Sequence, residues 1–264
     1  MDTRTPTPTG PEDPSPNLPS LTGAARMAVS YLALWLGLLT CGSVFLAFCG
    51  VAAVLSRFLG TEQQNRLGRR WMQRIFSGYL GLLDRGGILK VDNSALLAIR
   101  DEPSLILAPN HPSMLDVVLV ISRLDNVGCI MKAELLDNIF LGAGARMAGF
   151  ICNDPPRALV WQAVQDLQRG SQLLIFPEAT RTVRLPVNAL SGGFALIARK
   201  AGTPIQTILI ETESPYLRKG WPLLRTPPGR VHVRVRLGER FAPDADHRST
   251  LRRIEAYFAR ELGR

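Results

Sequence analysis

The hydrophobic pattern of the chain begins with one long apolar stretch. No charged residue occurs between Met27 and Ser56, and most positions there are Leu, Val, Ala or Phe. About 20 apolar residues are enough to cross a bilayer, and this stretch is too long for the core of a signal peptide. We predict that residues 22–58 form a transmembrane or membrane-embedded segment, with a hairpin or an oblique in-plane helix as alternatives to a single span.

The following segment has the period of an amphipathic helix. Over residues 62–83, large apolar side chains recur every four positions: Leu67, Trp71, Ile75 and Tyr79. Three arginines form a stripe beside them: Arg66, Arg70 and Arg74. Such a helix can lie on an anionic lipid surface, or it can pack on a domain with its arginines in water. The sequence leaves both alternatives open.

The remainder of the chain alternates short apolar runs with helical patterns. Buried strands are expected at residues 104–108, 127–131, 172–176 and 205–211, and a half-exposed strand at 231–238. Helices are expected from about Pro112 and at residues 156–169, 192–201 and 249–262. Strands that alternate with helices indicate an α/β fold, here a mixed, largely parallel sheet flanked by helices. One domain is predicted over residues 59–264, after a disordered, Pro-rich tail at residues 1–21.

Charge narrows the classes of partner. The chain has 31 Lys and Arg against 22 Asp and Glu, a formal net charge of +9. A basic protein suits nucleic acid, anionic lipid or a phosphorylated substrate. The arginines are dispersed and no nucleic-acid motif is present, so we expect no nucleic-acid partner. The four cysteines form no CxxC pair, which argues against a zinc site or a disulfide framework.

Arginines also predict the orientation in a membrane. Five of them follow the apolar segment within one short stretch: Arg57, Arg66, Arg69, Arg70 and Arg74. Only Arg4 and Arg26 precede it, and three acidic residues accompany them. The positive-inside rule then puts the domain on the cytoplasmic side.

One candidate site lies in "NHPSMLD", residues 110–116. Because a residue before proline avoids the helical conformation, His111 should be extended, while Pro112 suits a first helical turn. With His111 outside the helix and Asp116 inside it, the carboxylate can meet one imidazole nitrogen. That hydrogen bond would leave the other nitrogen free to accept a proton.

A second candidate site lies in "IFPEATRT", residues 175–182. An apolar strand ends at Phe176, and Glu178, Thr180 and Arg181 follow it in a loop. An arginine fork beside hydroxyl groups suits a phosphate or a carboxylate. A surface salt bridge between Glu178 and Arg181 is the alternative for this loop taken alone.

Together these loops resemble the paired signatures of the glycerolipid acyltransferase family, which acylates lysophosphatidic acid and its relatives. The first signature is matched by Asn110, His111, Ser113 and Asp116. The second, F-P-E-G-T-R-S, is matched by Phe176, Pro177, Glu178, Thr180 and Arg181. Weaker similarities are Lys132 with Glu134 and Leu135, Gly193 with Phe194, and Pro204 with Ile205. The resemblance covers roughly residues 85–215.

The resemblance implies a chemical role for the first loop. His111 would act as a general base on the acceptor hydroxyl, oriented by Asp116, and that hydroxyl would attack an acyl thioester. The acyl donor would be acyl-CoA or an acyl carrier protein, with no metal and no further cofactor. The acceptor would be 1-acyl-glycerol-3-phosphate, which makes phosphatidic acid the product.

It also implies binding roles and a location. Residues expected at the substrates are Glu178, Thr180, Arg181, Lys132, Ser113 and Arg146, with Arg181 facing the acceptor phosphate. The partners would be a lysophospholipid, the acyl donor and membrane lipids. The location would be a bacterial inner membrane, with the catalytic domain facing the cytoplasm.

The sequence departs from the family pattern at two places. Ala179 replaces the glycine of the second signature, so this loop must avoid a positive φ or accept strain. Asn153 and Asp154 stand where the family often has a phosphate-binding arginine, and Arg146 or Arg157 would have to substitute. Two alternatives therefore stay open: acyl transfer to another acceptor, such as a lyso-amino-acid or aryl polyene-type lipid, and a catalytically silent membrane-anchored binding protein.

Overall fold

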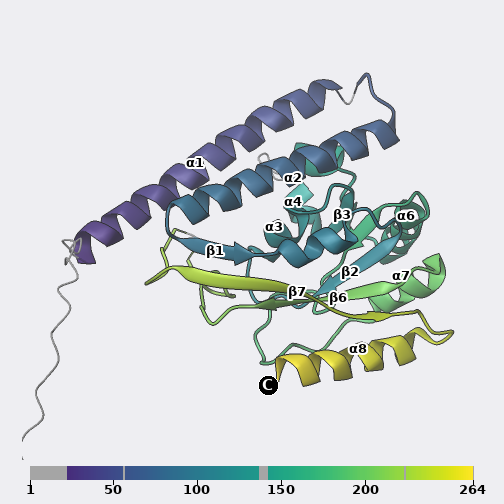
Figure 1. Ribbon diagram of the computed structural model, residues 1–264. Helices are drawn as coiled ribbons and strands as arrows, with labels where there is room; N and C mark the ends of the chain where they lie inside the picture. Colours follow the sequence, from purple (N-terminus) through teal and green to yellow (C-terminus); the bar gives the residue numbers. More distant parts are fainter. Residues whose placement is uncertain (1–22, 56, 137–141, 223, 264) are drawn as a thin grey trace, which may run out of the picture.

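A seven-stranded sheet forms the centre of the protein (Figure 1). The computed structural model describes residues 23–55, 57–136, 142–222 and 224–263. The predicted tail at 1–21 lies outside these residues. The strands are β1 (Leu89–Asp92), β2 (Leu105–Pro109), β3 (Val127–Met131), β4 (Ile151–Cys152), β5 (Gln172–Leu174), β6 (Ile205–Glu211) and β7 (Val231–Phe241).

The strand order is β1-β7-β6-β2-β5-β3-β4. The pairs from β6 through β4 are parallel, as is the β1–β7 pair, whereas β6 and β7 are antiparallel. The predicted mixed, largely parallel sheet is therefore confirmed. Its consequence for the site is that the carboxyl ends of β6, β2, β5 and β3 meet at one edge.

Helices cover both faces of the sheet. They are α1 (Gly23–Leu55), α2 (Thr61–Arg85), η1 (Ser94–Ile99), α3 (Asp116–Ile121), α4 (Ala133–Leu136), α5 (Gly142–Met147), α6 (Pro156–Gln168), α7 (Gly193–Ala201) and α8 (His247–Leu262). One apolar core joins the sheet to α1, α2 and α3, and a second joins it to α6, α7 and α8. In Figure 1, α1 and α2 lie above the sheet and α8 lies below it.

Strand burial follows the hydrophobic pattern of the sequence. Every residue of β2 is buried, as expected for a central strand covered on both faces. In β7, Val231, Val233 and Val235 are buried while His232 and Arg234 are exposed, which confirms the predicted half-exposed strand. The alternation arises because successive side chains of a strand point to opposite faces.

The apolar N-terminal helix lies along the domain. Its segment Tyr31–Leu55 is, within the described residues, the one helix long and apolar enough to cross a membrane. One side of α1 packs into the first core: Leu34, Phe45, Phe48, Cys49 and Ala52. Other large side chains of α1 are exposed: Val29, Leu32, Trp35, Leu36, Leu39, Val44, Leu46, Val51 and Val54. The helix thus has one side packed against the protein and another side exposed.

Helix α2 packs on the domain and still presents its arginine stripe. Met72, Ile75, Leu80 and Leu83 are buried, whereas Arg66, Arg70 and Arg74 are exposed. A Cβ on Gly68 would lie 2.6 Å from backbone atoms of Met147 and Ala148, so glycine allows this close approach. The two alternatives for α2 are compatible, because packing uses one face of the helix and leaves the basic face outside.

A buried arginine ties α2 to the sheet. Arg69 is 2% exposed and donates two 2.9 Å hydrogen bonds to the carboxylate of Asp166. It also donates to Asn126 Oδ1, Ser171 Oγ and the carbonyl of Ala148. The sequence analysis counted Arg69 among the arginines that orient a membrane segment, but its burial gives it a structural role.

Several local predictions need correction. The helix expected from about Pro112 begins at Asp116, because Ser113 to Leu115 form a turn that the Asp116 carboxylate caps. The strand expected at 172–176 ends at Leu174. Short elements were not anticipated at all: β1, β4, η1, α4 and α5. They are too short to produce a recognisable hydrophobic period.

Candidate active site

The two candidate loops meet at the carboxyl edge of the sheet. His111 follows β2 and Glu178 follows β5, and these strands are parallel neighbours. The backbone N–H of His111 donates a 2.9 Å hydrogen bond to Oε1 of Glu178. The backbone N–H of Thr182 donates to the carbonyl of His111 at 2.7 Å. The loops therefore hold each other in place from both sides of His111.

The imidazole of His111 is oriented by a carboxylate and an aromatic ring. Its Nδ1 lies 2.8 Å from Oδ2 of Asp116, which also accepts the backbone N–H of Ser113 at 2.8 Å. The ring stacks on Phe176 with 3.9 Å between centroids and 24° between planes. The side chain is 16% exposed. With Nδ1 directed at Asp116, the nitrogen available for proton transfer is Nε2.

Asp116 is a buried carboxylate whose hydrogen bonds are incomplete within the described residues. It has no solvent exposure, and its Oδ1 finds no hydrogen-bond partner among the described residues. Burial raises the pKa of Asp116 to about 6, although the hydrogen bond from His111 acts in the opposite direction. The carboxylate therefore carries its charge at neutral pH at a cost in folding free energy.

Glu178 is a buried brace between loops. Its Oε1 accepts the backbone N–H of His111 and the Thr182 hydroxyl at 2.7 Å. Its Oε2 accepts the backbone N–H of Asn188 at 2.8 Å. The side chain is only 4% exposed. The sequence alternative of a surface salt bridge with Arg181 does not describe this arrangement, because both oxygens are used by other donors.

The residue after Glu178 accepts the backbone conformation that glycine would favour. Ala179 has a φ of 54°, in the left-handed region that residues with a Cβ adopt at a cost. Of the two outcomes expected for this departure, the chain therefore has the strained one. The turn keeps Glu178 inward, while Ala179 and Thr180 are exposed.

Arg181 reaches a third loop, which follows β6. Its Nη1 donates to the carbonyls of Leu217 and Arg218 at 3.1 and 3.2 Å. The backbone N–H of Met114 donates to the same Leu217 carbonyl at 3.1 Å. The sequence does not indicate a role for this loop, because any residue type can supply a backbone carbonyl and no motif marks it.

Other predicted site residues are less tightly grouped. Ser113 is buried, and its hydroxyl accepts the backbone N–H of Leu115 at 3.1 Å. Lys132 is exposed directly after β3, at the same edge of the sheet. Arg146 is exposed near the end of α5 and interacts electrostatically with Cys49 of α1. Asn153 and Asp154 are exposed after β4. The geometry brings His111, Asp116, Glu178 and Arg181 together and leaves the rest around them.

Three supporting residues had no assigned role in the sequence analysis. Asn110 pairs with Ile210 through two hydrogen bonds, of 2.7 and 3.0 Å, and so fixes the end of β2 against β6. Phe176 supports the imidazole, and Asn188 Oδ1 accepts the N–H groups of Val183 and Arg184. In the described parts of the chain, no group of His, Cys, Asp and Glu side chains is arranged to hold a metal ion.

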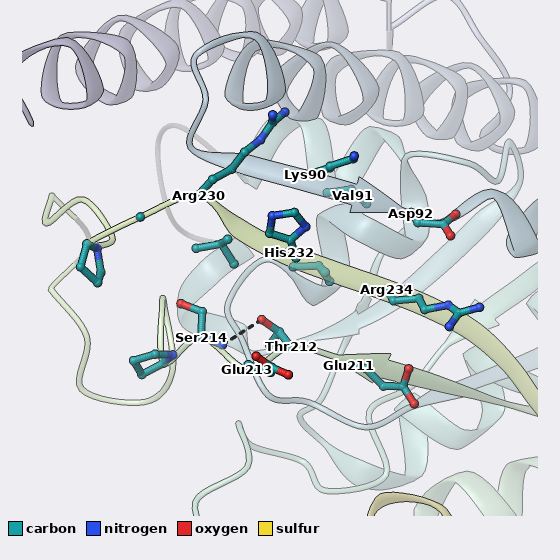
Figure 2. A pocket seen from close by; sticks show the side chains of 15 residues that line it. Lys90, Val91, Asp92, Glu211, Thr212, Glu213, Ser214, Arg230, His232 and Arg234 are labelled. Carbon is teal, nitrogen blue, oxygen red and sulfur yellow. Dashed lines mark hydrogen bonds between the residues drawn. The ribbon is translucent and has the colours of Figure 1, made fainter. Parts of the chain in front are cut away.

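A cleft of about 710 Å³ opens where β1, β7 and the end of β6 meet (Figure 2). Its lining contains none of the predicted site residues. Lys90, His232 and Arg234 lie along its two strands, and three acidic side chains share the lining: Asp92, Glu211 and Glu213. Because acids and bases are balanced there, the cleft has no clear preference for an anion.

Comparison with known proteins identifies a matching family model and a solved structure of similar fold. Residues 90–211 match the family model "Acyltransferase". A crystal structure of the 1-acyl-sn-glycerophosphate (LPA) acyltransferase PlsC from Thermotoga maritima is similar in fold. Its TM-score is 0.68 at 19% sequence identity, over 92% of this chain and 97% of that chain. None of the curated proteins matches this chain.

Proposed function

We propose a specific reaction for this chain, because residues 90–211 match the Acyltransferase family model and the fold is similar to that of an LPA acyltransferase. The protein transfers an acyl chain from an acyl thioester to the free hydroxyl of 1-acyl-glycerol-3-phosphate and so makes phosphatidic acid. His111 is the general base. The observation that carries this proposal is the 2.8 Å contact between His111 Nδ1 and Asp116 Oδ2.

The proton and electron movements follow from that contact. Nδ1 of His111 keeps its hydrogen and donates a hydrogen bond to Asp116, so the lone pair on Nε2 accepts the proton of the acceptor hydroxyl. The hydroxyl oxygen attacks the thioester carbonyl and forms a tetrahedral intermediate. The intermediate collapses, the C–S bond breaks, and the imidazolium returns its proton to the leaving thiolate. The products are an ester and a free thiol, with no acyl-enzyme.

Asp116 favours the imidazolium that forms during the reaction. An ionised carboxylate with little competition from other donors interacts strongly with a developing positive charge in a water-poor site. The unpartnered Oδ1 and the raised pKa of Asp116 are consistent with such a site. The burial of Asp116 costs folding free energy, and the same burial strengthens its interaction with the imidazolium.

Glu178 is assigned to positioning, in place of the acceptor contact that the resemblance implied. Both of its oxygens accept protein donors, one of which is the His111 backbone. Arg181 is assigned to the acceptor phosphate through its Nε and Nη2, because Nη1 is used by the Leu217 and Arg218 carbonyls. Lys132, Thr180 and Ser113 at the same edge, and Arg146 beyond it, complete the proposed binding residues.

The acceptor has a second candidate. The exposed Asn153 and Asp154 put a carboxylate where the family often has a phosphate-binding arginine. A carboxylate disfavours a nearby phosphate and suits an acceptor with an amine or no charge. A lyso-amino-acid lipid is therefore the alternative acceptor. The binding-protein alternative is less favoured, because residues 90–211 match the Acyltransferase family model and His111 lies against Asp116.

The membrane placement follows from the α1–α2 pair. If α1 crossed a bilayer upright, α2 beside it would carry the exposed Arg66, Arg70 and Arg74 into the hydrocarbon, which is costly. An in-plane arrangement avoids this, with the exposed apolar side of α1 in the lipid. We propose this arrangement on the cytoplasmic face of a bacterial inner membrane.

Acyl transfer by the purified full-length protein tests the proposal. Lysophosphatidic acid, lysophosphatidylcholine and a lyso-amino-acid lipid would each be offered with acyl-CoA or an acylated carrier protein. We expect transfer to lysophosphatidic acid, and transfer slower by about 10²-fold or more for His111→Ala. A clear preference for the amino-acid lipid would replace the first acceptor with the second, and transfer by His111→Ala at the wild-type rate would refute the base.

A further inference from the structure

One stretch near the end of the chain carries charge of a single sign. Residues 214–238 contain no Asp or Glu and six basic residues: Arg218, Lys219, Arg225, Arg230, Arg234 and Arg236. The last two lie in β7, and the first four lie in the connection before it. We call residues 214–230 the basic loop; Leu223 lies outside its described part. No proposed catalytic role uses its charges.

The basic loop is a folded surface. Trp221 Nε1 donates to the carbonyl of Arg225 at 3.0 Å, and the Arg225 guanidinium lies 5.2 Å from the Trp221 ring centre. The rings of Tyr216 and Trp221 meet edge to face at 5.8 Å. Lys219, Leu224 and Arg225 are exposed. Cations next to an aromatic ring and an exposed leucine are typical of surfaces that contact lipid headgroups.

The loop continues the surface that α1 begins. In Figure 1 the yellow-green connection before β7 lies beside the α1–α2 pair. Tyr216 and Leu217 are buried in the same core as α1 and α2, and Arg230 forms an ion pair with Asp84 of α2. The basic loop is therefore packed against the same helix pair that carries the exposed apolar side chains of α1.

The loop is also fixed to the catalytic loops. The Leu217 carbonyl accepts both Arg181 Nη1 and the backbone N–H of Met114. Leu217 is buried with a φ of 58°, a conformation that a leucine keeps only when its surroundings hold it. Movement of the loop relative to His111 is thus restrained.

We propose that the basic loop binds anionic lipid headgroups and holds the carboxyl edge of the sheet at the membrane surface. The cleft between β1 and β7, which both ends of the loop help to line, is a poorer candidate for anions than the exposed middle of the loop, because Asp92, Glu211 and Glu213 offset its bases (Figure 2). An acidic protein partner is less favoured, because the loop is packed against a helix pair in which α1 exposes a row of large apolar side chains. The proposal rests on the proposed function only in taking the acceptor to be a membrane lipid.

The chain offers a matched pair of variants for the test. Arg218→Gln/Lys219→Gln removes an Arg-Lys pair from the loop, and Arg199→Gln/Lys200→Gln removes one from α7, on the other side of the sheet. Co-sedimentation of the full-length protein would be measured with vesicles of phosphatidylcholine alone and with added phosphatidylglycerol. Because each cation near an anionic surface contributes about 1 kcal/mol, we expect a loss of roughly tenfold or more in partitioning onto anionic vesicles for the loop variant alone.

Activity gives a second, independent readout. For the loop variant, the ratio of turnover on anionic vesicles to turnover in neutral micelles should fall, while the α7 variant keeps the ratio. Equal partitioning of both variants onto anionic vesicles would overturn the proposal. So would a loop variant that binds vesicles normally but loses transfer from an acyl carrier protein, since the loop would then dock an acidic protein. Partitioning does not depend on acyl transfer, so failure of the proposed reaction would leave this test intact.

Discussion

Two buried carboxylates in this protein, those of Asp166 and Asp116, differ in how completely their hydrogen-bonding capacity is used. Arg69 and Asp166 form two hydrogen bonds with each other, and Arg69 has three further acceptors. Asp116 contacts His111 through one oxygen, and its other oxygen has no partner within the described residues. The Arg69–Asp166 pair, whose hydrogen bonds are complete, fixes two elements together. Asp116 has an oxygen without a partner, so it can still stabilise the positive charge that forms on the imidazole during the reaction. The first suits structure and the second suits catalysis.

The largest effect is expected for the imidazole itself. His111→Ala should lower turnover by about 10²–10⁴-fold, because base catalysis contributes that much. The thermal midpoint should fall less than for Arg69→Met, since the Asp116 carboxylate keeps its hydrogen bond from the Ser113 N–H. His232→Ala, an exposed histidine on β7, is the matched control for activity and stability. A large fall in the midpoint for His111→Ala would mean that the pair supports the fold.

The Arg69–Asp166 pair should respond in the opposite way. Arg69→Met leaves the Asp166 carboxylate buried without its partner, which typically destabilises a protein by about 3–5 kcal/mol. Arg69→Met/Asp166→Leu should recover much of that loss, because no charge then stays unpaired. Arg70→Met, at the exposed neighbouring position, should have almost no effect on denaturation. Equal midpoints for the Arg69 and Arg70 variants would show that the pair does not stabilise the fold.

Glu178 separates positioning from binding. Glu178→Gln keeps the shape but replaces one acceptor oxygen with an NH₂ group, which cannot accept a backbone N–H. We expect roughly a tenfold fall in kcat from the misplaced imidazole, with the KM for the acceptor nearly unchanged. Glu213→Gln, a nearby exposed carboxylate, is the control. A raised KM for the acceptor with a normal kcat would indicate that Glu178 binds the acceptor and does not position His111.

The smallest effect concerns the strained turn. Ala179→Gly should stabilise the protein by about 1 kcal/mol, because glycine adopts a positive φ without the Cβ contact. Chemical denaturation would measure the gain. Ala189→Gly, at an exposed loop position, gives the background effect of adding a glycine. A lower stability of Ala179→Gly would mean that the alanine side chain stabilises the protein by more than its positive φ costs.

The sequence predicted the parts of this molecule that have a period or a motif. Apolar runs located β2, β3, β5, β6 and β7, and proline explained how His111 and Asp116 could meet despite the spacing between them. The two-residue β4 and the short α5 gave no such signal. Burial of Arg69 was also invisible, because an arginine on an amphipathic helix is usually exposed.

The partners of the site residues were harder to predict than the residues themselves. The motif identified Glu178 and Arg181 but not their contacts with backbone groups of His111, Asn188 and Leu217. Leu217 lies far along the chain, and any residue type can supply a carbonyl. The resemblance therefore implied binding roles, while the geometry favours positioning for Glu178.

The unsatisfied state of Asp116 is tested most directly by Asp116→Asn. The pKa of Asp116 is raised in the fold from 3.8 to about 6, so the folded protein holds this proton more tightly than the unfolded chain does. The protonated Asp116 side chain therefore stabilises the folded protein fully below about pH 4, and this stabilisation is lost as the pH rises through 6. This increase in pKa corresponds to about 3 kcal/mol of folding free energy that the ionised carboxylate costs at pH 8.

The decisive measurement is the free energy of unfolding of Asp116→Asn relative to wild type at pH 4 and at pH 8, with turnover measured at pH 8. Asparagine cannot ionise, so the variant should gain stability relative to wild type between the two pH values while losing most of its turnover. A stability difference that is the same at both pH values, or a variant that keeps its turnover, would contradict the account.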